Sequence, residues 1–234
     1  PLQIGAEIYG HGGLESDLEI QSLMLRALSA AGVGGVHLDM GHVGVFRAIV
    51  TRGSLDADLE AELFRVLQAK DTAALTDLTA ALDRPVREAL MRLPELYGGA
   101  EVIARARAVL PDLPEIASAL DGLESIGRTL AAEVGELCFD LAELRGYHYH
   151  SGVVFAAYAR GAGDAIARGG RYDEVGKAFG RARPAPGFSI DLRGVAVVID
   201  LPGNNDGAAE LDCDGRLVAQ AGRWQVEAWG GRGK

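Results

Sequence analysis

The sequence predicts an α+β fold in which helices flank a mainly antiparallel sheet and a helical segment is inserted into the core. Apolar residues recur at helical spacing through residues 54–135, whereas from Leu137 they alternate with polar residues as in half-buried strands. Consecutive predicted strands often lack the intervening helix that a parallel crossover needs. With 234 residues, of which 48% are hydrophobic, the chain can bury a sizeable core.

Residues 1–53 are predicted to form the first part of this core. The chain begins with a strand, turns at the glycine-rich stretch Gly10 to Gly13, and enters a helix that stops at Gly32. Acidic residues in the first turn of that helix suit the positive end of the helix dipole. A short apolar strand from Val36 to Met40 follows, and His42 to Phe46 is predicted to open another helix.

Residues 54–135 are predicted to be helical almost throughout. Leucines recur at helical spacing behind a plausible N-cap at Ser54, and Pro85 suits a first helical turn. Pro94 interrupts the segment, and the longest amphipathic run extends from Ile116 to Val134. We interpret these apolar stripes as core rather than as a cofactor site.

Residues 136–194 are predicted to return to the core, and residues 195–234 to form a C-terminal segment rich in strands. The first strand of this half contains Leu137 to Leu141. Further strands are predicted at Val153 to Ala159, Gly187 to Leu192, Val195 to Leu201 and Arg223 to Trp229. The stretch from Pro202 to Gly207 has the composition of a turn.

Charge and composition exclude several classes of function. The 33 acidic and 23 basic side chains give a net charge of −10 without a dense basic run, so broad nucleic-acid binding is disfavoured. No apolar run approaches the roughly 20 residues of a membrane helix, and we expect a cytoplasmic protein. Cys138 and Cys213 match no metal or redox spacing, so we expect reduced, buried thiols and neither a metal site nor a cofactor.

The segment from Arg145 to Phe155 has the residue types of a pocket for a small charged ligand. An extended backbone would place Tyr147 and Tyr149 on one face, and His148 and His150 on the other. An arginine at the strand entrance can bind a carboxylate through two hydrogen bonds. We therefore expect a strand-borne pocket wall for an amino acid or a similar anion.

Four stretches, in order along the chain, resemble the motifs of one family. Gln3 to Gly10 is similar to the end of motif 2 of class II histidyl-tRNA synthetases, and Arg145 to Phe155 resembles their first histidine-specific motif. Gly169 to Asp173 resembles the second such motif, and Gly187 to Ile190 the start of motif 3. The resemblance implies a class II synthetase-like sheet, and it extends to the non-catalytic relatives of these enzymes, the ATP phosphoribosyltransferase regulatory subunits.

Three departures from the synthetase pattern favour the regulatory branch. The motif 3 arginine that holds ATP phosphates would fall at Gly194, and Arg193 is expected to point to the opposite face of a strand. The usual Leu-Asp-Tyr-Tyr stretch is replaced by Tyr147 to His150. The stretch after motif 3 is also shorter than an anticodon-binding domain requires. The resemblance therefore implies a protein without chemistry of its own.

The regulatory relatives imply a function and a set of site residues. Such a subunit activates a short-form catalytic ATP phosphoribosyltransferase, the enzyme of the first step of histidine biosynthesis, and makes it sensitive to histidine as the effector. We expect a homodimer within a hetero-oligomer. The resemblance implies Glu7 at the α-ammonium of histidine with Gln3 nearby, and Arg145 at its carboxylate. The imidazole side would be lined by Tyr149, His150 and Tyr172.

Simpler interpretations of the same residues stay open. Glu7 can pair with a neighbouring strand, Gly169 and Gly170 can serve a tight turn, and Tyr147 can belong to the core. His148 and His150 share a predicted strand face, but two imidazoles without a third ligand do not favour a metal site.

Two hypotheses therefore remain: a histidine-sensing regulatory subunit, and a histidyl-tRNA synthetase-like enzyme that activates histidine with ATP. The chain starts at Pro1 without motif 1, and the family normally has a longer insertion between Arg193 and Val195. We expect a fragment, or a chain with closed internal gaps, whose pocket lacks one wall.

Overall fold

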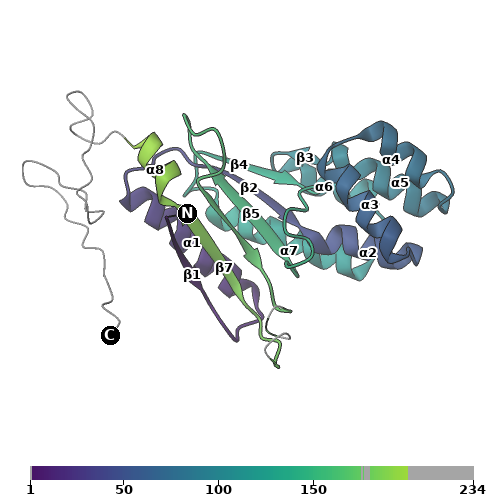
Figure 1. The fold of residues 1–234 in the computed structure, drawn as a ribbon, viewed down its shortest axis with the longest axis horizontal. Coiled ribbons are helices and arrows are strands. Elements are labelled where there is room, and N and C mark those ends of the chain that lie inside the picture. The colour runs from purple at the N-terminus through teal and green to yellow at the C-terminus, as the bar shows by residue number, and fades with distance from the viewer. Residues whose placement is uncertain (1, 175, 177–179, 200–234) are drawn as a thin grey trace, which may run out of the picture. The chain divides into compact units, whose positions relative to one another are not determined.

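The computed structural model describes residues 2–174, 176 and 180–199, and these contain a seven-stranded sheet (Figure 1). The strands, in their order across the sheet, are β1 (Gln3–Glu7), β7 (Pro186–Asp191), β6 (Ala167–Arg171), β5 (Val153–Tyr158), β2 (His37–His42), β4 (Glu136–Asp140) and β3 (Tyr97–Gly98). Neighbouring strands run antiparallel, except that β2 and β4 are parallel. The predicted α+β class with a mainly antiparallel sheet is confirmed.

Eight α-helices accompany this sheet in the described residues. They are α1 (Leu14–Ala30), α2 (Val43–Gly53), α3 (Ala57–Gln68), α4 (Thr72–Thr79), α5 (Arg84–Arg92), α6 (Glu101–Val109), α7 (Pro114–Leu130) and α8 (Leu192–Val198), with a 3₁₀ turn at Leu93–Glu95. α1 packs on β7 and β6, and α7 packs on α1, α2 and β2. Figure 1 shows α3, α4 and α5 grouped at the side of the sheet away from β1 and β7. None of the helices in the described part has the length and apolar character needed to span a bilayer.

The core lies between the sheet and the layer of α1 and α7. One row of paired strand residues, Met40, Phe155 and Phe188, faces these helices and is at most 7% exposed. Ile20 of α1 and Ile126 of α7 are fully buried. Burying such a side chain contributes about 1.5–3 kcal/mol, so this apolar layer holds the sheet against the helices.

The strand register places a different row of side chains on the opposite face of the sheet. Ser189, Arg168, Asp39 and Cys138 lie on directly paired positions of β7, β6, β2 and β4, with Ala156 between them on β5. Because paired residues share a face, these side chains point away from the helices. We call this side the polar face of the sheet.

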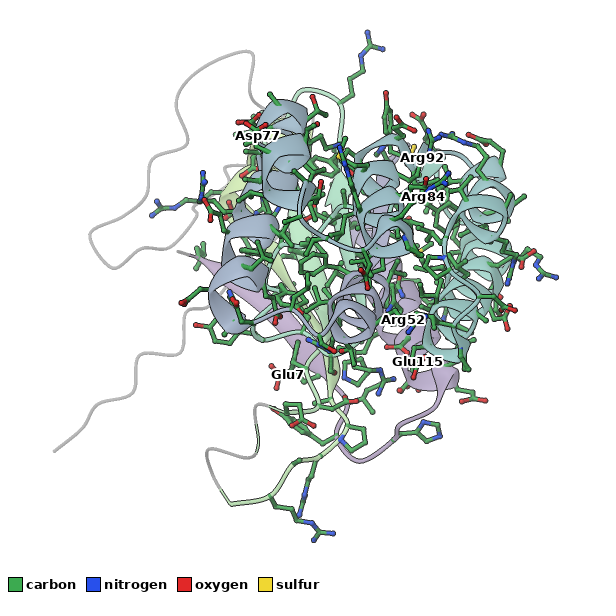
Figure 2. All side chains as sticks on the ribbon, turned by 90° about the vertical axis from the view of Figure 1, so that its right-hand side faces the viewer. Glu7, Arg52, Asp77, Arg84, Arg92 and Glu115 are labelled. Carbon is green, nitrogen blue, oxygen red and sulfur yellow. The ribbon has the colours of Figure 1, made fainter. Side chains whose placement is uncertain are left out.

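The helical segment has a charged surface. Arg84 pairs with Glu88 at 2.7 Å, and Arg92 pairs with Glu95 at 2.8 Å, with both arginines on the outside of the helices (Figure 2). Solvent screens such exposed pairs, so they add little stability. The segment is held by its buried leucines instead, as its sequence pattern predicted.

The predicted cap at Ser54 is wrong. Ser54 follows the end of α2 in a left-handed conformation, with φ at 50°, and the next helix begins at Ala57. Asp56 is the N-cap, because its carboxylate accepts a hydrogen bond of 2.9 Å from the N–H of Leu59. Ser54 in its left-handed conformation turns the chain between the two helices, so Asp56 occupies the N-cap position of the second helix.

The segment that begins at Arg145 is a loop up to the start of β5, and its predicted alternation is wrong. Gly146 has φ at 70°, and its carbonyl accepts hydrogen bonds of 2.8 Å from the N–H groups of Tyr149 and His150. This turn separates the side chains of Tyr147 and Tyr149, which a strand would place on one face. Tyr147 is 3% exposed, as the core interpretation predicted, whereas Tyr149 is 70% exposed.

One alternative interpretation and two further predictions are wrong. Gly169 and Gly170 lie inside β6 rather than in a tight turn, since their small size lets neighbouring rings and strands approach. The strand predicted from Val195 is helical up to Val198, because Asp191 accepts a hydrogen bond of 3.1 Å from the N–H of Arg193 and starts α8. Cys138 is partly exposed rather than buried. Residues 200 and 201 of that predicted strand, the turn after it, the last predicted strand and Cys213 lie outside the described residues.

Candidate functional site

A cavity of about 410 Å³ opens beside the sheet, between its central strands and the loop that precedes β5. Glycines and apolar residues of β5, β6 and β7 form its floor. Six ionisable or phenolic side chains line it: Glu7, Glu143, Arg145, His150, Arg168 and Tyr172. The cavity therefore combines two carboxylates, two guanidiniums, one imidazole and one phenol around one open space.

Glu7 provides a carboxylate at the β1 side of the cavity, and Figure 2 marks its position. The hydroxyl of Tyr172 donates to Oε1 of Glu7 at 3.3 Å, and that of Tyr9 donates to Oε2. Burial, together with Glu7, raises the pKa of Tyr172, so its hydroxyl stays protonated at neutral pH. Both phenols therefore act as donors that orient the carboxylate.

Arg145 provides a guanidinium whose positive charge is already paired with the carboxylate of Glu143. Its Nη2 lies 3.2 Å from Oε2 of Glu143, and its own backbone N–H donates to Oε1 of Glu143 at 2.8 Å. Partial burial alone would lower the pKa of Arg145, but Glu143 and Tyr158 raise it, so the group is charged. A ligand carboxylate has to share or displace this internal pair.

His150 forms an aromatic wall together with Tyr172, whose ring centroid lies 5.8 Å away. Nδ1 of His150 lies 3.3 Å from the carbonyl oxygen of Arg171. Burial lowers the pKa of His150, which favours a neutral ring at neutral pH. A Cβ on Gly146 would approach Cδ2 of this ring to 2.5 Å, and one on Gly170 would approach Nδ1 to 2.6 Å. The two glycines therefore make the space that the ring occupies.

Arg171 holds the strand beneath this wall against the start of α1. Its Nη2 donates to Asp17 Oδ2 at 2.9 Å, to Ser16 Oγ at 2.8 Å and to the carbonyl oxygen of Gly13 at 3.0 Å. Arg171 and Asp17 are 7% and 6% exposed. The sequence signal for this role was an arginine directly after a glycine pair and directly before Tyr172 of the cavity.

The structure brings together four of the six residues predicted for the ligand site. Glu7, Arg145, His150 and Tyr172 line the cavity, whereas Gln3 and Tyr149 do not. Gln3 is exposed on β1, four residues before Glu7 and on the same strand face. Sequence reasoning missed Tyr9, Glu143 and Arg168. The sequence did hold a signal for two of them: Glu143 is two residues before Arg145, and Arg168 directly precedes the glycine pair.

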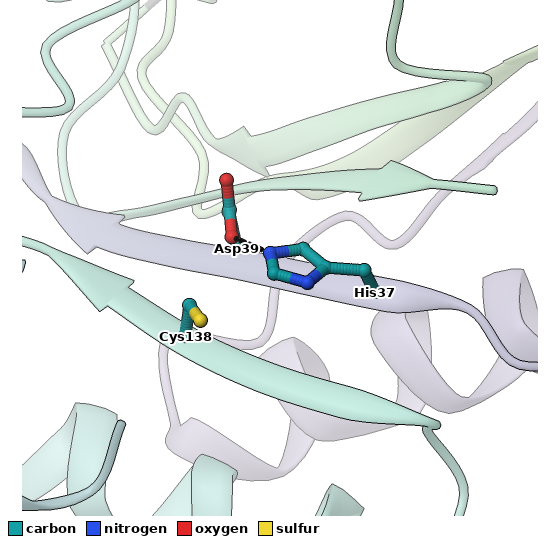
Figure 3. Close-up of side chains that lie close together, drawn as sticks. All are labelled: His37, Asp39 and Cys138. Atoms are coloured by element: carbon teal, nitrogen blue, oxygen red, sulfur yellow. Dashed lines mark hydrogen bonds and ion pairs between the residues drawn. The ribbon is translucent and has the colours of Figure 1, made fainter. Parts of the chain in front are cut away.

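A second group of polar side chains lies on the polar face, where β2 and β4 run side by side. His37, Asp39 and Cys138 approach one another closely there (Figure 3). In the described residues this is the group whose atoms have the spacing of metal ligands.

Family models and a similar protein both indicate the family that the sequence motifs resemble. Residues 1–195 match the family model for histidyl-tRNA synthetase, and residues 191–227 match that for the ATP phosphoribosyltransferase subunit HisZ C-terminal domain. The chain is 50% identical to the ATP phosphoribosyltransferase regulatory subunit of Nitrosospira multiformis over 266 residues, which covers 97% of this chain and 68% of that protein. Because 266 exceeds the 234 residues here, that relative carries residues within the matched stretch that this chain lacks.

Solved structures with the same fold include an ATP phosphoribosyltransferase regulatory subunit/histidyl-tRNA synthetase from Bacillus halodurans. Its TM-score is 0.74 at 28% identity, covering 84% of this chain and 53% of that one. An ATP phosphoribosyl transferase (HisG:HisZ) complex from Thermotoga maritima contains a chain with a TM-score of 0.63 at 21% identity, covering 80% of this chain and 65% of that one. The chain thus spans between half and two thirds of these structures, and the predicted class II synthetase-like sheet is confirmed.

Proposed function

The chain belongs to the family of ATP phosphoribosyltransferase regulatory subunits of histidine biosynthesis, and we propose that it senses histidine in the cavity beside β5. In this proposal it activates a short-form catalytic ATP phosphoribosyltransferase in the cytoplasm, as part of a hetero-oligomer that contains a homodimer of this chain. The observation that carries the proposal is the cavity itself, in which a carboxylate, a guanidinium and two aromatic rings meet.

The cavity matches the chemistry of a zwitterionic amino acid with a ring. Glu7 offers its carboxylate to the α-ammonium, and Arg145 offers its guanidinium to the α-carboxylate. His150 and Tyr172 flank the space for the imidazole, and a neutral His150 does not repel a cationic ligand. Gln3 and Tyr149 stay in the proposal as histidine contacts, although neither lines the cavity.

Histidine binding would affect the rest of the chain through the loop that precedes β5. The ligand carboxylate competes with Glu143 for Arg145, so binding changes the contacts of the loop that carries both residues. Arg47 of α2 donates to the carbonyl oxygen of His150 at 3.1 Å, and the same loop is hydrogen-bonded to α3. A shift of the loop therefore acts on the helices, and a partner subunit would experience it as a coupling free energy.

We further propose that the chain does not activate histidine with ATP. The position expected for the ATP-binding arginine is Gly194. Arg193 does not point away on a strand, as the sequence suggested, but lies exposed in the first turn of α8. Incubation with ATP, histidine and labelled pyrophosphate tests this statement directly. Measurable exchange would replace the regulatory function with that of a synthetase-like enzyme.

Calorimetric titration of histidine tests the ligand assignment. Arg145→Ala should weaken binding by about 10- to 150-fold, because a hydrogen bond to a charged group contributes about 1.5–3 kcal/mol. Arg26→Ala removes an exposed guanidinium of α1 and should leave the affinity unchanged. Equal affinity in the wild type and in Arg145→Ala would exclude Arg145 as the carboxylate ligand.

Co-purification with a short-form catalytic ATP phosphoribosyltransferase tests the partner. The complex should be more active than the catalytic subunit alone, and histidine should inhibit it. Light scattering of the complex measures its stoichiometry and shows whether two copies of this chain are present. Failure of the two proteins to associate would overturn the proposed partner.

A further inference from the structure

Three side chains with different donor atoms meet on the polar face of the sheet, and none of them lines the proposed histidine cavity. His37 and Asp39 are two residues apart on β2, and Cys138 lies on β4 directly opposite Asp39. One donor atom from each lies within 4.8 Å of the other two. Figure 3 shows the three side chains close together over the two neighbouring strands. Strand pairing alone assembles this group from segments about 100 residues apart.

Each ring nitrogen of His37 faces a carboxylate. Nε2 lies 2.5 Å from Oδ1 of Asp39, and Nδ1 lies 2.9 Å from Oε2 of Glu136, which pairs with His37 in the strand register. With a cation at Nε2, the Nδ1–H would donate to Glu136. This is the arrangement in which an outer carboxylate orients a metal-bound histidine and increases its basicity.

The local charge also favours a cation. In the described residues neither Asp39 nor Glu136 has an ion pair with a lysine or arginine, and both contact His37 instead. Asp140, on the same strand as Cys138, shows the contrast, because it pairs with Lys70 at 2.9 Å. A divalent ion would offset the two negative charges and stabilise the thiolate.

We propose that His37 Nε2, the Asp39 carboxylate and Cys138 Sγ together bind one zinc ion, with water as the fourth ligand. An imidazole nitrogen, a carboxylate oxygen and a thiolate sulfur suit zinc, whereas magnesium and calcium require oxygen ligands. The His37 and Asp39 side chains are 33% and 32% exposed, so solvent reaches the open position. The sequence alone predicts no metal here, because neither the cysteine spacing nor the pair His148 and His150 has a metal-binding pattern.

Cobalt titration of the untagged, reduced full chain tests the site. One equivalent of Co²⁺ should give tetrahedral d–d bands and a thiolate-to-cobalt charge-transfer band, and Zn²⁺ should displace it. Cys138→Ser should abolish the charge-transfer band, whereas the matched control Cys213→Ser should keep it. Asp39→Asn and His37→Ala should each lower the zinc affinity by at least about tenfold, and Glu136→Gln by about 10- to 100-fold through the orientation of His37.

Three outcomes would overturn the site: no saturable binding of one equivalent, a charge-transfer band that persists in Cys138→Ser, or one that disappears in Cys213→Ser. Circular dichroism of each variant shows that it is folded before the metal is added. The site does not depend on the proposed histidine binding. A His37→Ala protein that loses zinc but binds histidine normally separates the two proposals.

Discussion

The hydroxyl of Tyr147 donates a hydrogen bond of 2.5 Å to Oε1 of Glu60, which is 87 residues earlier in the chain. Tyr147 is 3% exposed, and its ring packs against Phe46 at a centroid distance of 5.2 Å. Burial, reinforced by Glu60, raises the pKa of Tyr147 to about 12, so the hydroxyl is a donor across the neutral range. This bond joins the loop that carries His150 to α3 of the helical segment.

Removing this hydroxyl should therefore destabilise the protein. Tyr147→Phe keeps the ring and should lower the free energy of unfolding by about 1.5–3 kcal/mol, because the acceptor is charged. Tyr149→Phe is the matched control, since that ring is 70% exposed, and it should change little. Urea unfolding measures both variants. Equal effects would show that the Glu60 contact adds no stability.

The ion pair of Asp17 and Arg171 should contribute more. Both side chains are buried, and Arg171 loses its main charged partner in Asp17→Asn. Breaking a buried pair from one side costs about 3–5 kcal/mol. Glu15→Gln removes an exposed carboxylate from the same first turn of α1 and controls for the helix dipole. Thermal unfolding should show a large loss for the first variant and a small one for the second.

His42 should make the protein sensitive to acid. Its ring is partly buried at the start of α2, and Nδ1 accepts a hydrogen bond of 3.0 Å from the N–H of Gly44. Burial, with Arg47 and Arg171 nearby, lowers the pKa of His42 to about 4, below the ordinary value near 6.5. The unfolded chain therefore binds the proton first. Stability should be full above about pH 6.5 and fall by about 3 kcal/mol on the way to pH 4.

Urea unfolding between pH 4 and 7 checks this expectation. His42→Asn retains a capping acceptor but does not titrate, so the loss of stability in acid should shrink. His11→Asn is the matched control, because His11 also accepts from a backbone N–H two residues later but is exposed. His150, whose pKa burial lowers as well, should leave part of the acid sensitivity in place. An unchanged pH profile in His42→Asn would contradict the assignment.

Gly187 should be needed for histidine binding. A Cβ at this position would collide with the hydroxyl of Tyr172 and would approach Cγ of Glu7 to 2.8 Å. Gly187→Ala should therefore displace both groups from the cavity and weaken histidine at least about tenfold, a loss of about 1.4 kcal/mol. Gly163→Ala places its Cβ in open space and should bind normally. Calorimetry compares the two, and equal affinities would exclude these contacts.

The candidate ligand site could be predicted in part. Glu7, Arg145, His150 and Tyr172 followed from motif chemistry, and the cavity brings them together. Tyr149 did not follow, because a turn at a glycine with positive φ ended the alternation that a strand would have continued. The partner of Arg145 was also missed, since Glu143 reaches it only through the geometry of the same loop.

The amino-acid sequence by itself determined the α+β class, most helices and strands, and the family motifs, because apolar periodicity, caps and motif spacing are local properties of a chain. Only the tertiary structure decided which distant side chains meet. Arg171 meets Asp17, and Cys138 meets His37, through strand order and helix packing that no local pattern encodes. Long-range contacts depend on how whole elements pack, and both the buried ion pair and the proposed zinc site arise at that level.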